Sequence, residues 1–76
     1  MHHVVISCFK TDISAANLEH LQKCVTELLQ RDLGCREDAV SIDLQQVEPA
    51  NWREQIYQPM IAPRLSSLLR QPGYQY

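Results

Sequence analysis

The residues best able to do chemistry in this chain are few and scattered. His2 and His3 stand at the amino end, and the ordinary pKa of histidine, about 6.5, suits proton transfer near neutral pH. His20 and Cys24 lie one helical turn apart, a spacing at which two side chains can share a metal ion. A helical projection turns His20 toward solvent and Cys24 toward the flank of the core, so we expect no metal site.

Two further residues are candidates for ligand binding. Lys10 could hold an anion, although a lysine in a loop is more often a solvated charge. Trp52, the single tryptophan, could wall a pocket or belong to the core. Taken alone, His2 is a polar residue at a frayed terminus. Residue types by themselves therefore assign no catalyst.

Length and composition define the kind of protein that must position these residues. The chain has 76 residues, of which 45% are hydrophobic and 21% charged, and a formal net charge of -2. These values predict one folded domain over residues 1–76 and exclude a disordered chain. A chain this short buries only about 60% of the surface that its unfolded form exposes. Its core therefore needs a disulfide, a metal or a partner subunit.

The three cysteines predict reduced thiols in a cytoplasmic protein, because their number is odd, they lack C-x-x-C spacing and no secretory leader precedes them. No apolar run approaches the ~20 residues that span a bilayer, which argues against a membrane protein. Scattered basic residues argue against nucleic-acid binding, which needs clustered positive charge. A partner subunit is then the remaining source of stability.

Hydrophobic periodicity predicts strand, helix, strand in the first two thirds of the chain. Apolar residues alternate over residues 3–9 and 39–47, which is typical of half-buried strands. Between them, Ser14 is a good N-cap, Gly34 a good helix stop, and apolar residues recur at helical spacing. Two strands joined by a long helix form a parallel pair with a right-handed helical crossover.

A second amphipathic helix is predicted after the second strand. Asn51 is expected to cap a short helical turn that carries Trp52. The apolar residues expected on the helix itself are Ile61, Leu65, Leu68 and Leu69. It should start near Pro63 or tolerate one missing hydrogen bond, and residues 72–73, Pro-Gly, should end it. We expect the tyrosines that follow, Tyr74 and Tyr76, to pack against a neighbouring protomer.

The predicted fold class is therefore α/β (α+β), a β-α-β-α unit. Two strands are too few for independent stability, and such a sheet has two open edges and an uncovered face. Pairing two protomers would give a four-stranded sheet with four helices. The sequence thus predicts a homodimer, and a higher oligomer is the alternative.

Three segments carry a resemblance to a known family. Residues 40–52 read VSIDLQQVEPANW, residues 61–63 read IAP, and residues 71–74 read QPGY. Together with the β-α-β-α order, they resemble the 4-oxalocrotonate tautomerase family, and within it the short dimeric bacterial PptA-type tautomerases. The resemblance covers nearly the whole chain.

The resemblance implies an isomerase that moves a proton between the enol and keto forms of a 2-oxo acid such as phenylpyruvate. It implies no cofactor and no metal. In the family an amino-terminal proline, exposed by removal of the initiator methionine, carries the proton as a secondary amine. The ordinary pKa of an α-amino group, about 7.7–8.0, falls on desolvation, so such an amine is a free base near neutral pH.

This chain departs from the family at that position, where it carries His2. His2 could act through its imidazole, Met1 could be removed to leave a primary amine, or the chain could be inactive, naturally or because the position was altered. The resemblance implies that Trp52 walls the substrate pocket. Arginines of the family are replaced by Lys10 and Ser41, so Lys10 is the candidate for the substrate carboxylate. The alternative function is a noncatalytic protein of the same fold that binds small molecules or serves as a scaffold.

Overall fold

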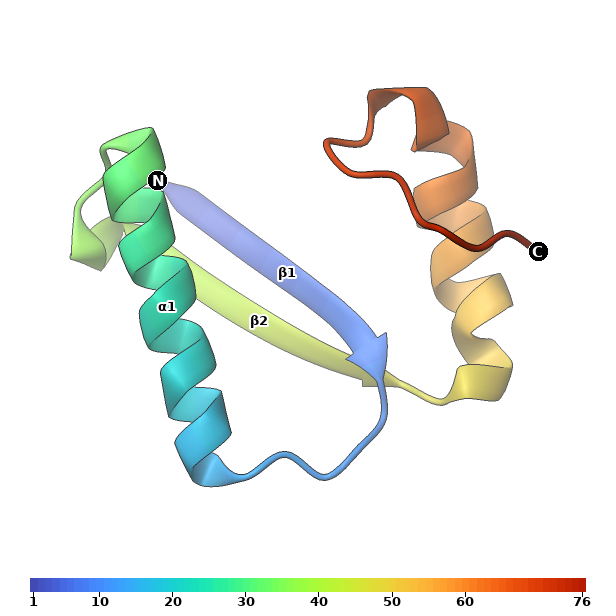
Figure 1. Cartoon of the computed structure of the whole chain (residues 1–76), viewed down its shortest axis with the longest axis horizontal. Coiled ribbons are helices and arrows are strands. Elements are labelled where there is room, and N and C mark those ends of the chain that lie inside the picture. The colour runs from blue at the N-terminus through green and yellow to red at the C-terminus, as the bar shows by residue number, and fades with distance from the viewer.

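The computed structural model describes all residues, 1–76, and consists of two strands, one long helix and a helical C-terminal segment (Figure 1). In chain order the elements are β1 (His2–Phe9), α1 (Ala15–Leu33), η1 (Glu37–Ala39), β2 (Val40–Val47), η2 (Pro49–Asn51), η3 (Arg53–Ile61) and η4 (Ala62–Ser67). The predicted strand-helix-strand order is confirmed. No helix of the chain has the length and apolar character that crossing a bilayer requires.

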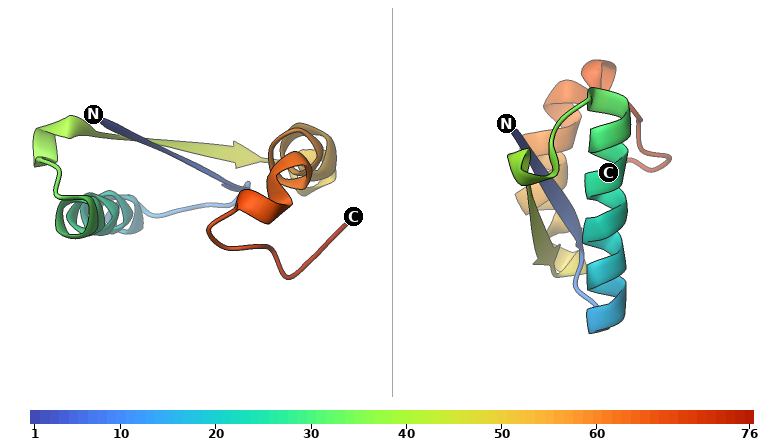
Figure 2. Two further views of the ribbon diagram at one scale, coloured as in Figure 1. Left: turned by 90° about the horizontal axis from the view of Figure 1, so that it is seen from above. Right: turned by 90° about the vertical axis from the view of Figure 1, so that its left-hand side faces the viewer.

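The strands form a two-stranded parallel sheet in register from His2 opposite Val40 to Phe9 opposite Val47. Both therefore run from a shared amino end to a shared carboxyl end. Figure 2 shows α1 along one side of this strand pair and no element directly over the other. Most of the residues that alternate toward the uncovered side, which we call the open face, are exposed, while Ser7 is half-buried and Val47 is buried at its carboxyl end. The exposed ones are His3, Val5, Phe9, Ser41, Asp43 and Gln45.

Both ends of α1 follow the predicted capping chemistry. The hydroxyl of Ser14 accepts a hydrogen bond from the amide of Asn17 at 3.1 Å. At the other end Gly34 has a φ of 67°, and its amide donates to the carbonyl of Gln30. A residue with a Cβ is strained at such a φ, which explains why the helix stops at this glycine.

The prediction for the second helix was wrong in its bounds and its geometry. Residues 49–67, which we call the arm, are helical almost without interruption, but Arg53–Ile61 forms wide π-helical turns. Pro59 lies inside these turns, where it has no amide hydrogen to donate and its ring crowds the preceding turn. The arm ends at Ser67, so Leu68 and Leu69 lie outside it.

The expected cap at Asn51 is also absent. Asn51 is the last residue of the 3₁₀ turn Pro49–Asn51, and its amide donates to the carbonyl of Glu48 at 2.9 Å. No side chain caps this turn or the π-helical turns that follow Trp52. The chain turns from β2 into the arm through backbone bonds alone.

The C-terminal tail packs on the arm of its own chain, while Tyr74 and Tyr76 stay 46% and 56% exposed, so their contact with a neighbouring protomer stays a prediction. The ring of Tyr57 lies 5.7 Å from that of Tyr74 and 4.9 Å from that of Tyr76, measured between centroids. Tyr57 is one of three buried residues in the protein, together with Val47 and Ile56. The tail thus completes a small aromatic cluster at the arm.

A single protomer has almost no core. None of the α1 side chains is buried. The protomer exposes 6166 Å², whereas a compact monomer of its mass exposes about 4,800 Å². Its radius of gyration is 14.2 Å, against about 11.4 Å for a compact domain of this length. The excess surface supports the argument that the chain needs a partner.

Candidate functional site

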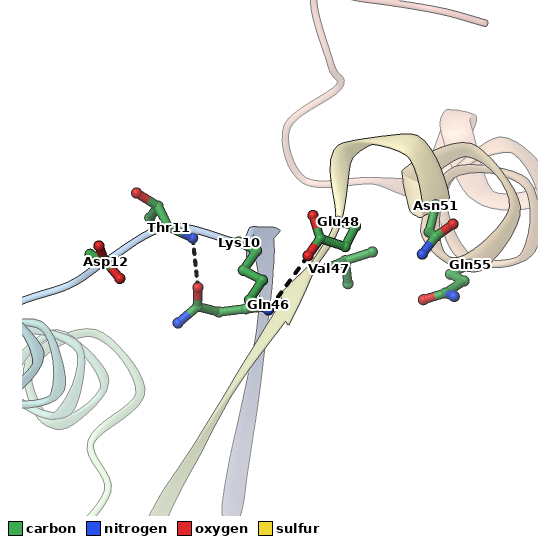
Figure 3. Close-up of a pocket in the computed structure, with 8 residues that line it drawn as sticks. All are labelled: Lys10, Thr11, Asp12, Gln46, Val47, Glu48, Asn51 and Gln55. Atoms are coloured by element: carbon green, nitrogen blue, oxygen red, sulfur yellow. Dashed lines mark hydrogen bonds and ion pairs between the residues drawn. The ribbon is translucent and has the colours of Figure 1, made fainter.

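A cleft of about 830 Å³ opens where the carboxyl ends of the two strands meet the base of the arm (Figure 3). Eight residues line it, and all but one are polar: Lys10, Thr11, Asp12, Gln46, Val47, Glu48, Asn51 and Gln55. In parallel sheets the carboxyl ends of strands are where ligands commonly bind, because chain segments leave the sheet there. The cleft is suited to a polar or charged small molecule.

Lys10 supplies the only positive charge of the cleft. Its amide donates to the carbonyl of Val47 at 2.9 Å, which extends the strand pairing by one bond. Its ammonium nitrogen lies 3.5 Å from a carboxylate oxygen of Glu48, and both side chains are more than half exposed. An ion pair this exposed contributes about 0–1 kcal/mol. A ligand carboxylate can therefore take the place of Glu48 beside Lys10.

Gln46 at the end of β2 holds the loop that follows β1. Its side-chain oxygen accepts a hydrogen bond from the amide of Thr11 at 2.8 Å (Figure 3). Sequence reasoning did not identify Gln46, Asn51 or Gln55 as lining residues. The sequence does carry one indication of a special role for Gln46. Two consecutive glutamines interrupt the alternation of apolar and polar residues in β2 just before the strand ends.

Trp52 stands beside the cleft at the base of the arm. Its ring meets that of Phe9 edge to face, with centroids 5.2 Å apart and an interplanar angle of 85°. Its indole nitrogen donates to the hydroxyl of Tyr74 at 2.9 Å. Since Phe9 directly precedes Lys10, the structure brings the two candidate substrate-binding residues to the same end of the sheet. Trp52 is half-buried and joins the arm, the tail and β1.

His2 lies at the other end of the strand pair. It faces Val40 in the register, and β1 extends about 23 Å from His2 to Phe9 at 3.3 Å per residue. The side chain is half-buried, and its Nδ1 atom is buried without a hydrogen-bond partner. The neighbouring His3 differs, because its Nδ1 lies 2.6 Å from the hydroxyl of Ser41 on the open face. One protomer therefore does not unite His2 with Lys10 and Trp52.

The other candidate pair, His20 and Cys24, lies on α1. The sulfur of Cys24 is 3.4 Å from Nε2 of His20, and both side chains are exposed, so Cys24 is not packed at the core as its helical angle indicated. No group of three or more histidine, cysteine or acidic side chains is placed to hold a metal ion. The three cysteines are unpaired.

A parallel β-α-β unit followed by a helical segment, with a polar cleft at the carboxyl ends of its strands, forms a small α+β domain that is consistent with a tautomerase-like fold. No family model matches the chain. Over 74 residues, 97% of each protein, it is 40% identical to Tautomerase PptA of Klebsiella pneumoniae subsp. pneumoniae. It is 33% identical to Tautomerase PptA of Cronobacter sakazakii over 75 residues, 99% of each, and 32% identical to that of Escherichia coli O127:H6 over 97% of each. The chain therefore belongs to the PptA-type tautomerase family.

Proposed function

We propose that this protein is a homodimeric tautomerase that interconverts the enol and keto forms of a 2-oxo acid such as phenylpyruvate. The observation that carries the proposal is the 40% identity to a tautomerase over nearly the full length of both chains. We assign His2 as the catalytic residue, and Lys10 and Trp52 as substrate-binding residues. The reaction needs no metal or cofactor, because a proton only moves within the substrate. Three unpaired cysteines support a cytoplasmic location.

The separation of His2 from the cleft is the reason to build the site from two chains. The free edge of β1 can pair with its own copy about a two-fold axis, which makes the strands antiparallel and the sheet four-stranded. Such pairing turns the partner end to end. The amino end of the partner's strands then meets the carboxyl end of the first protomer, where Lys10 and Trp52 lie. His2 of the partner subunit completes the site in this arrangement.

Each of the three residues has a defined task in that composite site. The ammonium of Lys10 binds the substrate carboxylate in exchange for Glu48, and Trp52 packs against the apolar part of the substrate. The imidazole of His2 accepts the enol hydroxyl proton and returns a proton to the adjacent carbon as the carbonyl forms, which leaves the imidazole neutral again. Within the protomer Nδ1 of His2 makes no hydrogen bond, so no protein group already occupies it.

The second candidate function is a noncatalytic tautomerase-fold protein that binds a small acid or serves as a scaffold. The observation that favours it is His2 itself, which stands where the resemblance implies a catalytic proline. Both candidates predict ligand binding in the cleft, so binding alone does not separate them. Turnover does.

The deciding experiment follows the enol-keto conversion of phenylpyruvate by absorbance in three proteins: the parent, His2→Ala and His2→Pro. Intact mass must first establish whether Met1 is present in each, since a terminal amine at position 2 exists only after its removal. A catalytic His2 predicts turnover by the parent above the buffer rate and its loss in His2→Ala. If the parent and a Met1-free His2→Pro protein are both inert, the cleft is not a tautomerase site.

A further inference from the structure

The arm contributes two side-chain amides to the cleft, and neither has a partner in the protomer. Asn51 ends the turn η2 and Gln55 lies near the start of η3, and both line the cleft. Both residues are exposed, and their side chains make no hydrogen bond to the protein. Figure 3 shows both on the side of the arm that faces the strand ends. The donors and acceptors of these two amides are therefore available to a ligand.

The cleft offers little apolar surface beside these amides. Val47 is the one apolar residue in its lining, and only 9% of it is exposed. Trp52 stands next to the cleft with its ring against Phe9, and it does not belong to the lining. A phenyl ring placed along Asn51 and Gln55 would cover their amides without offering them hydrogen bonds, and polar groups covered in this way weaken binding. The cleft therefore suits a ligand whose distal end is polar.

The charges of the cleft restrict which polar group fits at that end. Lys10 is the positive residue of the lining, and Asp12 and Glu48 are negative. Asp12 forms no ion pair, and Glu48 loses its own when a ligand carboxylate takes its place beside Lys10. A second carboxylate on the ligand would then meet charges of its own sign, which repel it. An uncharged N–H group can donate to amide oxygens and to carboxylates alike.

We propose that Asn51 and Gln55 select 2-oxo acids whose distal end is a heteroaromatic ring with an uncharged N–H donor, in preference to phenylpyruvate. This inference rests on the proposed function for the ligand carboxylate at Lys10. A side-chain amide both donates and accepts hydrogen bonds, so a ring with one N–H and one bare nitrogen can pair with both residues. Imidazol-4-ylpyruvate carries such a ring. Its affinity should exceed that of phenylpyruvate about two- to twelvefold, the net effect of one hydrogen bond.

Calorimetric titration of the full chain with imidazol-4-ylpyruvate and with phenylpyruvate tests this preference. At about pH 8 the imidazole ring is neutral, because its ordinary pKa is about 6.5, so a difference in affinity does not come from ligand charge. Gln55→Met replaces the amide by an apolar chain of similar length and should remove most of the preference, and Asn51→Leu should reduce it. The matched control Gln58→Met alters an exposed glutamine of the arm outside the cleft lining and should keep the preference.

The binding data separate this selection from the tautomerase reaction, because they involve no turnover. Equal affinity of the parent protein for the two ligands overturns the selection and leaves the reaction to the phenylpyruvate assay. A preference that persists in both Gln55→Met and Asn51→Leu also overturns it, because the discrimination then lies elsewhere in the protein. A folded parent that binds neither ligand overturns the selection together with the cleft of the proposed function. A preference that Gln55→Met removes, in a protein without turnover, supports the selection and contradicts only the enzymatic function.

Discussion

The exposed ion pair in the cleft allows a quantitative test of Lys10 as the substrate anchor. Glu48→Gln removes the charge that lies 3.5 Å from the Lys10 ammonium while keeping the shape of the side chain. At that distance two unit charges in water attract by about 1.2 kcal/mol. Both side chains are more than half exposed, so solvent and the ordering of two long side chains reduce the net value to about 0.2–1 kcal/mol.

A substrate carboxylate must displace Glu48 to reach Lys10, so removing this competitor should strengthen binding by the same free energy. We expect Glu48→Gln to bind phenylpyruvate about 1.4- to fivefold more tightly. Calorimetric titration measures this without turnover, so the prediction holds for a catalytic and a noncatalytic protein alike. The gain should shrink at high salt, because salt screens exposed charges.

Two controls separate this effect from a general change in charge. Glu54→Gln removes the same charge from the first turn of η3, where Glu54 forms no ion pair, and should leave affinity nearly unchanged. In a Lys10→Met background Glu48→Gln should have no effect on affinity. Equal gains from Glu48→Gln and Glu54→Gln, or a gain that persists without the lysine, would refute Lys10 as the anchor.

Two further predictions concern the elements that hold the site. Ser14→Ala removes the cap of α1 and should lower the free energy of unfolding by about 1 kcal/mol, measured by urea unfolding at fixed protein concentration; Ser66→Ala, which loses no hydrogen bond, should be near neutral, and equal losses would contradict the capping role. Tyr74→Phe removes the acceptor of the Trp52 indole and should cost about 0.5–1.5 kcal/mol. It should also shift the fluorescence of the single tryptophan, whereas Tyr76→Phe should not; identical spectra would show that the hydrogen bond does not hold Trp52.

The strands and α1 could be predicted from the sequence because local signals agree there. Alternation over β1 and β2, the cap at Ser14 and the left-handed stop at Gly34 all favour one structure, and the structure contains it. The arm could not be predicted in detail, because Pro59 disrupts regular hydrogen bonding without ending the helix. Its π-helical turns shift the helical period, so the spacing that placed Leu68 and Leu69 on one helical face did not apply.

The candidate site, like the fold, could be predicted from the sequence only in part. Lys10 and Trp52 were predicted as separate candidates, and strand pairing with the Phe9–Trp52 contact brings them to one end of the sheet. The polar residues across the cleft were missed because Gln46 belongs to a strand and Gln55 to a helix, and a sequence read along one element does not show which side chains face each other across a turn. Such convergence is a property of tertiary structure.

The proposed homodimer would supply stability and chemistry through the same contact between protomers. A protomer with three buried residues lacks the core that would make it stable alone, and it holds His2 about 23 Å from the cleft along β1. In the homodimer that we propose, antiparallel pairing of β1 would answer both deficits at once, because the contact that covers exposed apolar side chains would also bring the amino end of one chain to the cleft of the other. In that dimer core and site would both be shared between the chains, and a substitution at His2 would change both of its composite sites.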